Sequence, residues 1–244
     1  MSLKALNISQ YLDSTFLKTS VELEISEIEL EKKIDLFINE AIDCDFKCVM
    51  IRPKFVSLAK AIISEKKSSV SVGTVIDFPL GNSMPEIKIN EAKVVLKEGA
   101  DELDFVCDYN RFKMGEYDVF DQSIFDCTKL SLEKNTVVKW IIETGALSKN
   151  EIKLISKRIF DIVFKNFPNE ISRVFIKTST GYYGGLGATI KDVKSIKSIV
   201  SGMPVKASGG VSDLKSSLNM IEAGVDRIGT SKALIIYNEW KKIN

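Results

Sequence analysis

The chain has 244 residues, 45% hydrophobic and 27% charged, a balance typical of a globular protein. A formal net charge of +1 without a Lys/Arg block argues against nucleic acid or an anionic membrane as a partner. Residues 1–10 lack the pattern of a secretory signal and no apolar run approaches a membrane span, so we expect a cytoplasmic protein.

The cysteine and histidine content narrows the chemistry. The four cysteines show neither a CxxC pair nor a disulfide framework, so we expect them to be reduced; they are Cys44, Cys48, Cys107 and Cys127. The chain has no histidine, which excludes His-based triads and the usual His-rich zinc site and argues against a metal-dependent aldolase or hydrolase. Proton transfer must therefore use Lys, Asp, Glu, Tyr, Cys or water.

The N-terminal half alternates strand-like and helix-like segments. After a short N-terminal segment, residues 8–13 predict a first strand. The capping-box pair Ser26 and Glu29 then opens a helix with apolar residues at helical spacing. Further strands are predicted at 48–51, 70–78 and 102–107, with helices that begin near Pro53 and Pro85 and a longer one at 117–134.

The same alternation continues to the end of the chain. A β-branched and aromatic run predicts a strand at 136–143, and Ser148 with Glu151 repeats the capping box before the next helix. Two short strands carry Lys177 and Lys206, with a glycine-rich loop and a helix at 189–200 between them. A helix at 212–222, a strand at 227–229 and a last helix beginning at Thr230 and Ser231 complete the prediction.

This order predicts an α/β fold, namely a single (β/α)8 TIM barrel with an additional N-terminal segment. Eight strands separated by helices in a chain of this length match a barrel better than a doubly wound sheet. No linker or low-complexity segment divides the chain. We therefore expect one domain that spans residues 1–244.

Two similar stretches predict the chemistry: V-F-I-K-T-S-T-G from Val174 and P-V-K-A-S-G-G from Pro204. Lys177 and Lys206 stand in apolar strands, where an ammonium group is costly to bury. If the two strands are neighbours, about 5 Å separates their backbones. Mutual repulsion and burial should then lower at least one lysine pKa and give a nucleophilic amine for a carbonyl.

Two carboxylates belong to the same predicted site. The active site of a TIM barrel lies at the C-terminal ends of its strands, and Asp13 and Asp104 are predicted at or near such ends, with both lysines. The alternative is structural: each lysine extends its amine to water or pairs with a carboxylate, for which Asp104 is the obvious candidate.

Glycine-rich loops after the last three strands suggest an anion site. They contain Gly181, the pair Gly209 and Gly210, and the run Gly229-Thr230-Ser231. Glycine lets backbone amides approach an anion, and a helix that begins at Thr230 or Ser231 would add N–H donors. Loops after strands seven and eight are the recurrent phosphate position of this fold, although ordinary turn glycine is the alternative.

The chain resembles the 2-deoxyribose-5-phosphate aldolase family along nearly its whole length. The matching stretches are Y-L-D-S-T-F-L-K from Tyr11, T-V-I-D-F-P-L-G from Thr74, G-A-D-E-L-D from Gly99, V-K-W-I-I-E-T-G from Val138, I-K-T-S-T-G from Ile176, V-K-A-S-G-G from Val205 and R-I-G-T-S from Arg227. The resemblance implies a class I lyase that cleaves deoxyribose 5-phosphate reversibly to glyceraldehyde 3-phosphate and acetaldehyde, in deoxyribose phosphate catabolism.

The resemblance also implies residue roles. Lys177 would form the Schiff base, Lys206 would perturb it and Asp104 would act in the proton relay. The substrate-binding residues would be Asp13 near the sugar hydroxyl, with Thr180, Gly181, Gly209, Gly210, Thr230 and Ser231 around the phosphate end. It implies no metal or organic cofactor, and a homodimer. Some family members end with a tyrosine in a C-terminal tail. This chain instead ends K-K-I-N, and Tyr237 would be the equivalent of that tyrosine.

Two other functions stay open on the sequence. One is another Schiff-base barrel aldolase, of the transaldolase or ketose bisphosphate type, which would take a bulkier donor than acetaldehyde. The other is a phosphate-binding barrel without catalysis, serving as a sensor or scaffold. Trapping with acetaldehyde separates the first from the main prediction, and a cleavage assay separates the second.

Overall fold

Eight parallel strands close into a barrel in the computed structural model, which describes residues 6–243. Each strand pairs with the next along the chain, and β8 pairs with β1. The strands are β1 (Leu12–Phe16), β2 (Cys48–Ile51), β3 (Ser71–Ile76), β4 (Glu102–Val106), β5 (Val137–Ile141), β6 (Val174–Lys177), β7 (Val205–Ser208) and β8 (Arg227–Thr230). The TIM barrel predicted from the sequence is confirmed.

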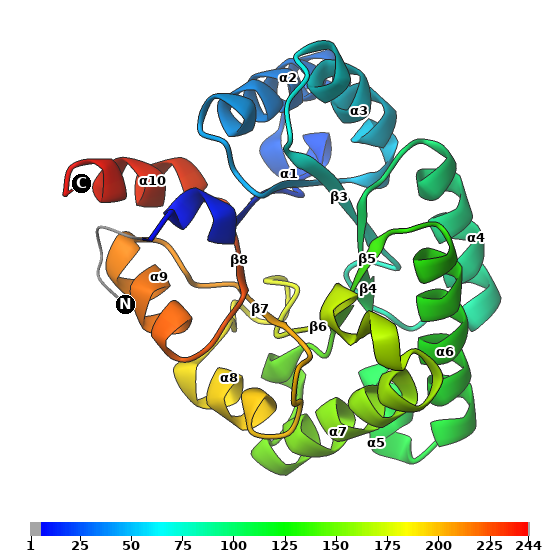
Figure 1. The fold of residues 1–244 in the computed structure, drawn as a ribbon. Helices are drawn as coiled ribbons and strands as arrows, with labels where there is room; N and C mark the ends of the chain where they lie inside the picture. Colours follow the sequence, from blue (N-terminus) through cyan, green and yellow to red (C-terminus); the bar gives the residue numbers. More distant parts are fainter. Residues whose placement is uncertain (1–5, 244) are drawn as a thin grey trace.

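Helices form the outer ring of the barrel (Figure 1). The helices of the described residues are α1 (Ser20–Leu23), α2 (Glu27–Asp43), α3 (Val56–Glu65), α4 (Pro85–Lys97), α5 (Tyr109–Met114), α6 (Tyr117–Glu133), α7 (Lys149–Asn166), α8 (Ile190–Lys197), α9 (Leu214–Glu222) and α10 (Ala233–Lys241); the short α1 lies inside the ring that the longer helices form. Short 3-10 turns add η2 (Ile8–Tyr11), η3 (Pro53–Phe55), η4 (Thr144–Ala146) and η5 (Pro168–Arg173). The capping boxes that begin α2 and α7 are formed as predicted. Among residues 6–243, no helix combines the length and apolarity needed to cross a membrane.

Two predicted boundaries are wrong. Residues 8–13 do not form the first strand, because the side chain of Asn7 accepts a hydrogen bond from Ser9 N–H and caps the turn η2; β1 begins at Leu12. The last helix does not begin at Thr230 or Ser231. Thr230 ends β8, its hydroxyl accepts a hydrogen bond from Lys232 N–H, and α10 begins at Ala233.

Alternation along the strands separates two layers of side chains. Leu103 and Phe105 on β4 and Trp140 on β5 are fully buried in the main hydrophobic core, where the strands meet the helices. Asp104 and Lys139 alternate with them and therefore face the barrel interior. The register sets these two residues directly opposite each other across β4 and β5.

The barrel interior has an apolar part and a charged part. A separate small cluster of Leu17, Cys48, Met50 and Val75, with Phe78 against it, lies on the side of β1 to β3. The interior of this fold is normally filled by branched apolar side chains. Here β4 to β8, together with Asp13 on β1, instead place lysines, carboxylates and an arginine inside, which shows where the fold departs from ordinary packing.

A buried lysine outside the barrel interior has a structural role. Lys88 on α4 is 1% exposed and donates hydrogen bonds to the carbonyl oxygens of Gly81, at 2.8 Å, and Val106, at 2.6 Å. The Asp77 carboxylate lies 3.1 Å from the same ammonium group. Its three N–H donors therefore have three oxygen partners. Lys88 fastens the segment that follows β3 to the end of β4.

We expect Lys88→Met to lower the free energy of unfolding by about 3 kcal/mol or more, because it leaves Asp77 and two carbonyl groups short of a buried donor. Urea denaturation measures the change. The matched control is Lys93→Met on the exposed face of the same helix, which should stay within about 0.5 kcal/mol of the unsubstituted chain. Equal effects of the two substitutions would contradict the structural role.

Candidate active site

Six charged side chains form a closed ring inside the barrel. Carboxylates and cations alternate around it in the order Asp104, Lys139, Glu102, Arg227, Asp13, Lys206 and back to Asp104. Every member is at most 5% exposed. Because each charge stands between two of the opposite sign, the ring balances its own charge without solvent.

The contacts around the ring are short. Lys139 Nζ lies 2.5 Å from Glu102 Oε2 and 2.7 Å from Asp104 Oδ1. Lys206 Nζ lies 2.6 Å from Asp13 Oδ2 and 2.9 Å from Asp104 Oδ2. Arg227 closes the ring at 2.5 Å from Asp13 Oδ1 and 3.0 Å from Glu102 Oε2. Four of these contacts are charge-assisted hydrogen bonds, whereas Lys139 with Glu102 and Lys206 with Asp13 are close ion pairs.

Lys177 is a fourth cation attached to this ring from outside. It ends β6, directly opposite Lys206 in the register, and its Nζ donates to Asp104 Oδ2 at 2.8 Å. Asp104 is its one carboxylate partner among the described residues, and that oxygen is already shared with Lys206. Lys177 is therefore the one cation without a carboxylate of its own.

The pKa of Lys177 falls to about 8 from an ordinary 10.5. Burial is the largest cause, since Lys177 is 3% exposed; Asp104 acts in the opposite direction, and the charge of Lys206 lowers the pKa further. The pairing with Asp104 and the crowding of two lysines, which the sequence left as alternatives, are thus both present. A lysine with this pKa is roughly one-tenth neutral at pH 7, against under a thousandth for an ordinary lysine.

The carboxylates of the ring stay ionised. Burial alone would raise the pKa of Asp104, but Lys139, Lys177 and Lys206 together hold it well below its usual value. Burial likewise opposes ionisation of Asp13, and Arg227, Lys206 and Lys139 nevertheless lower its pKa to about 2. Both aspartates are therefore acceptors of hydrogen bonds near neutral pH.

Ligand atoms of Asp13, Cys48 and Glu102 lie within 4.8 Å of one another, a spacing compatible with a metal ion. The surroundings oppose one. Arg227 and Lys139 already pair with both carboxylates, and burial, followed by the charges of Glu102 and Asp13, raises the pKa of the Cys48 thiol well above its usual value. A divalent cation would meet two fixed positive charges and a protonated thiol, so these residues do not suit it.

The predicted residues come together inside the barrel. Lys177 stands at the end of its strand, whereas Asp104 is in the middle of β4 and Asp13 and Lys206 are second in β1 and β7. These three therefore lie two or three residues before the ends of their strands, and Lys206 is directly opposite Lys177 in the register. All four side chains are buried.

The glycine-rich loops after β6 and β7 touch each other above the site. A Cβ on Gly187 would lie 2.4 Å from the carbonyl carbon and oxygen of Gly209, so only glycine permits this approach. Ala188 N–H donates to the carbonyls of Ser208, at 3.0 Å, and Gly209, at 3.1 Å. Gly181, Gly209 and Gly210 all have positive φ, which glycine adopts without strain.

The loop after β8 is linked to the loops after β6 and β7 by the Thr230 hydroxyl. Thr230 Oγ1 donates to the carbonyl of Val211 at 2.6 Å, which ties the end of β8 to the loop after β7. Ser231 is exposed beside it. The predicted phosphate residues are therefore close together, although a helix N-terminus at Thr230 does not contribute because α10 begins later.

Thr180 is held by a residue that the sequence analysis did not select. Its hydroxyl donates to the Glu143 carboxylate, and its N–H lies 3.2 Å from Glu143 Oε2. Glu143 is 1% exposed and has a left-handed backbone at φ 45°. Burial raises its pKa despite the hydrogen bonds from Thr180 and the nearby charge of Lys177. This carboxylate anchors the start of the β6 loop beside the site.

Glu102, Lys139 and Arg227 were also missed, although the sequence carries signals for them. Lys139 stands in an apolar strand as Lys177 and Lys206 do, but no glycine loop follows it directly. Glu102 precedes Asp104 by two residues and so shares its face of the strand. The apolar strand around Lys139 and the two-residue spacing of Glu102 and Asp104 are the signals that could have found these two residues.

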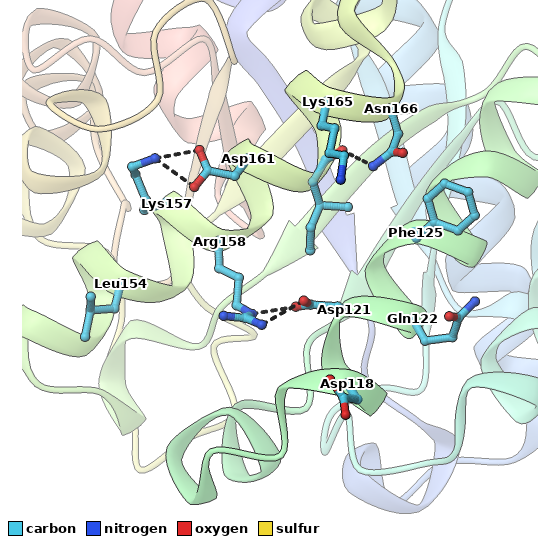
Figure 2. Close-up of a pocket in the computed structure, with 11 residues that line it drawn as sticks. Asp118, Asp121, Gln122, Phe125, Leu154, Lys157, Arg158, Asp161, Lys165 and Asn166 are labelled. Atoms are coloured by element: carbon cyan, nitrogen blue, oxygen red, sulfur yellow. Dashed lines mark hydrogen bonds and ion pairs between the residues drawn. The ribbon is translucent and has the colours of Figure 1, made fainter.

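A groove of about 680 Å³ lies elsewhere, on the outside of the barrel between α6 and α7 (Figure 2). Four of its charged residues form two pairs: Arg158 with Asp121 at 2.5 Å, and Lys157 with Asp161 at 2.6 Å. Figure 2 shows these pairs lying along the groove rather than converging on a common point. The interior of the barrel is therefore the better candidate for chemistry.

Known proteins resemble this chain over its full length. It is 40% identical over 232 residues to the deoxyribose-phosphate aldolase of Thermococcus gammatolerans, covering 95% of each chain. Its identity to the deoxyribose-phosphate aldolase of Thermococcus kodakarensis is 38% over 230 residues, which is 94% of this chain and 95% of that one. No family model matches the chain.

Solved structures agree with these relatives. "QR15, an Aldolase" superimposes with a TM-score of 0.84 at 34% identity, covering 97% of both chains. A deoxyribose phosphate aldolase from Aeropyrum pernix, described as tetrameric, superimposes with a TM-score of 0.79 at 28% identity, covering 97% of this chain and 92% of that one.

The ring predicts opposite stability effects for the two neighbouring lysines. Protonated Lys177 destabilises the fold fully below pH 8, and the effect disappears as pH rises toward 10.5, the value of an unfolded chain. Lys177→Leu should therefore raise the free energy of unfolding at pH 7 by about 2 kcal/mol, with a smaller gain at pH 9. Lys206→Leu should lower it by roughly 3–5 kcal/mol, because two carboxylates lose a shared cation. Urea denaturation at both pH values measures this, and destabilisation by both substitutions at pH 7 would contradict it.

Proposed function

Since the chain belongs to the deoxyribose-phosphate aldolase family and is a carbon–carbon lyase, we propose that Lys177 is its Schiff-base nucleophile. The substrate we propose is 2-deoxy-D-ribose 5-phosphate, cleaved reversibly to glyceraldehyde 3-phosphate and acetaldehyde. The observation that supports this most directly is the position of Lys177: buried, opposite Lys206, and bonded to an aspartate oxygen that Lys206 already shares.

The first step uses the neutral amine of Lys177. Its nitrogen adds to the aldehyde carbon C1 of the open-chain sugar, and loss of water gives a protonated imine. This iminium withdraws electrons from the bond between C2 and C3. When that bond breaks, its electron pair moves into an enamine on Lys177 and C3 leaves as the aldehyde of glyceraldehyde 3-phosphate.

Proton movement falls to Asp104 and Lys206. Cleavage requires a proton to leave the C3 hydroxyl and later a proton to reach C2 of the enamine. Asp104 Oδ2 lies 2.8 Å from Lys177 Nζ and 2.9 Å from Lys206 Nζ, so one oxygen serves both amines. With no histidine in the chain, this shared contact is the proposed relay, with a water completing it.

Substrate binding is proposed for the residues around the mouth. Asp13 would face the sugar hydroxyl, and Thr180, Gly181, Gly209, Gly210, Thr230 and Ser231 would hold the phosphate end. The contacts that draw the loops after β6, β7 and β8 together support this proposal. A fixed phosphate orients C1 toward Lys177 and so lowers the entropic part of the barrier.

The domain organisation, partners and oligomeric state are proposed from the same family membership. We propose that residues 1–244 form one aldolase domain, which the closed barrel of the described residues supports. The partners would be a small phosphorylated sugar and acetaldehyde. The homodimer stays a prediction for this chain, since the relative from Aeropyrum pernix is described as a tetramer.

Lys177→Leu should lower the rate of deoxyribose 5-phosphate cleavage by at least about a thousandfold, because no other residue supplies the imine nitrogen. Treatment with acetaldehyde and borohydride should add one reduced ethyl group to Lys177 in the unsubstituted chain, read by peptide mass spectrometry, and none in the variant. Lys191→Leu, at an exposed position of α8, serves as the control and should retain the rate. Cleavage at an equal rate without Lys177 would refute the Schiff base. An adduct on another lysine, or none with acetaldehyde, would favour a different barrel aldolase.

Lys206→Leu should lower activity strongly and move the acidic limb of the pH profile of kcat/KM upward. Its charge lowers the pKa of Lys177, and without it Asp104 interacts more fully with the Lys177 ammonium group. Rates measured between pH 5 and pH 10, values chosen as roughly spanning this pKa, give the limb. An unchanged limb would remove Lys206 from this role.

A further inference from the structure

One side of the ring lies away from Lys177. Glu102 and Arg227 are the first residues of β4 and β8, so they lie at the N-terminal end of the barrel, away from the mouth. Glu102 also borders a groove on that end together with Ser71 and Val137. Arg227 stands opposite Asp104 in the ring, with two residues and three ion pairs between them on either side.

We propose that Glu102 and Arg227 are positioning residues that set the charge of Lys177 through the ring, without touching substrate. This inference rests on the proposed role of Lys177. It goes beyond that role because it assigns a function in the reaction to two residues that the motif of paired lysines does not contain.

The geometry supports the proposal in two steps. Glu102 draws Lys139 Nζ to 2.5 Å, and Lys139 in turn takes Asp104 Oδ1 at 2.7 Å, which leaves Oδ2 of Asp104 for Lys206 and Lys177. On the other side, Arg227 takes Asp13 Oδ1 and leaves Asp13 Oδ2 for Lys206. In both aspartates, one oxygen is taken by the cation nearer the N-terminal end of the barrel and the other is left for the lysines near the mouth. Glu102 and Arg227 thus position Asp104 and Lys206, which are the neighbours of Lys177.

Among the described residues, seven other charged or titratable groups surround Glu102 and Arg227, counting Lys177, the lysine they act on. They are Asp13 on β1, Cys48 on β2, Asp104 on β4, Lys139 on β5, Lys177 on β6 and Lys206 on β7, with Glu143 beside Lys177. On β3, Gly73 and Val75 face the interior without charge. Of the four cations, Lys177 has the fewest carboxylate partners, so it gives up its proton first when the charge of the ring changes.

Removing a negative charge and removing a positive charge from the ring should therefore shift the ionisation midpoint of Lys177 in opposite directions. Glu102→Gln removes a negative charge and should shift the ionisation midpoint of Lys177 down by about one pH unit, the order of magnitude for one charge within the same buried network at an effective dielectric constant near 20. Arg227→Gln removes a positive charge and should shift the midpoint up by a similar amount. The double variant should return it to within about half a unit of the unsubstituted chain, because the net charge is restored.

The midpoint is measured by competitive labelling with acetic anhydride across the pH range, with acetylation of Lys177 read by mass spectrometry. This measurement needs no aldolase activity, so it remains valid if Lys177 does not form the Schiff base; that separate failure appears as absence of the borohydride adduct. Arg227→Lys keeps the charge but loses the fork of the guanidinium, and should leave the midpoint within a few tenths of a unit even if kcat falls.

A purely structural role gives a different result. In that case both neutral variants and the double variant would unfold more easily and lose activity, with the midpoint of Lys177 unchanged or moved in one direction only, and the proposal would be overturned. If Glu102→Gln does not fold, Glu102→Asp replaces it; withdrawing the carboxylate by one methylene should give a smaller downward shift, and no shift would likewise refute the proposal. Far-UV circular dichroism establishes which variants are folded.

Discussion

One buried carboxylate shared by three ammonium groups is the interaction on which the site depends. Asp104 accepts from Lys139 through one oxygen and from Lys177 and Lys206 through the other. Such a group is stable in a dry interior only while its partners remain cationic and correctly placed. The other ring members, Glu102, Arg227 and Asp13, keep two of these partners in place, and Lys177 is left as the cation that the ring does not require.

The excess of one cation over the carboxylates, four against three, gives the physical reason for reactivity. Six charges in the ring balance one another, and a seventh, on Lys177, has no counter-charge of its own. Neutral Lys177 restores balance, so the interior favours loss of its proton. Lys88 shows the contrast, since it is also buried but has two carbonyl oxygens and a carboxylate within reach, none of them shared with another cation among the described residues. Burial of a lysine is therefore not sufficient for chemistry; the number of oxygens available to it decides the outcome.

Much of this site could be predicted from the sequence because it is local in sequence or set by chain order. Successive βα units make β6 and β7 neighbours, which places Lys177 beside Lys206, and the apolar strands around both lysines require burial. Depth within the barrel was not predictable in the same way. It depends on register: Asp104 is opposite Lys139, and the hydrophobic pattern of β4 locates the strand without locating its partner residues.

The boundary errors have local causes of the same kind. Thr230-Ser231 looks like the start of a helix, but Thr230 belongs to the sheet and uses its hydroxyl to join Val211 and Lys232, so the helix begins later. Asn7 forms a turn where an apolar-leaning segment suggested a strand. In each case a short polar side chain bonds to the nearby backbone and competes with regular structure, which composition and periodicity do not register.

Backbone packing completes the argument, because the ring needs space that ordinary side chains would occupy. A Cβ at Gly229 on β8 would lie 2.3 Å from Ser208 Oγ and 2.9 Å from Lys206 Cε, so any larger residue there would push Lys206 from its place between two aspartates. The glycine in R-I-G-T-S thus serves the lysine on the neighbouring strand as well as the loop that follows. The Lys206 nitrogen is positioned both by charge balance within the ring and by the lack of a side chain at Gly229. Together these hold it close enough to Lys177 for the two amines to compete for one carboxylate oxygen.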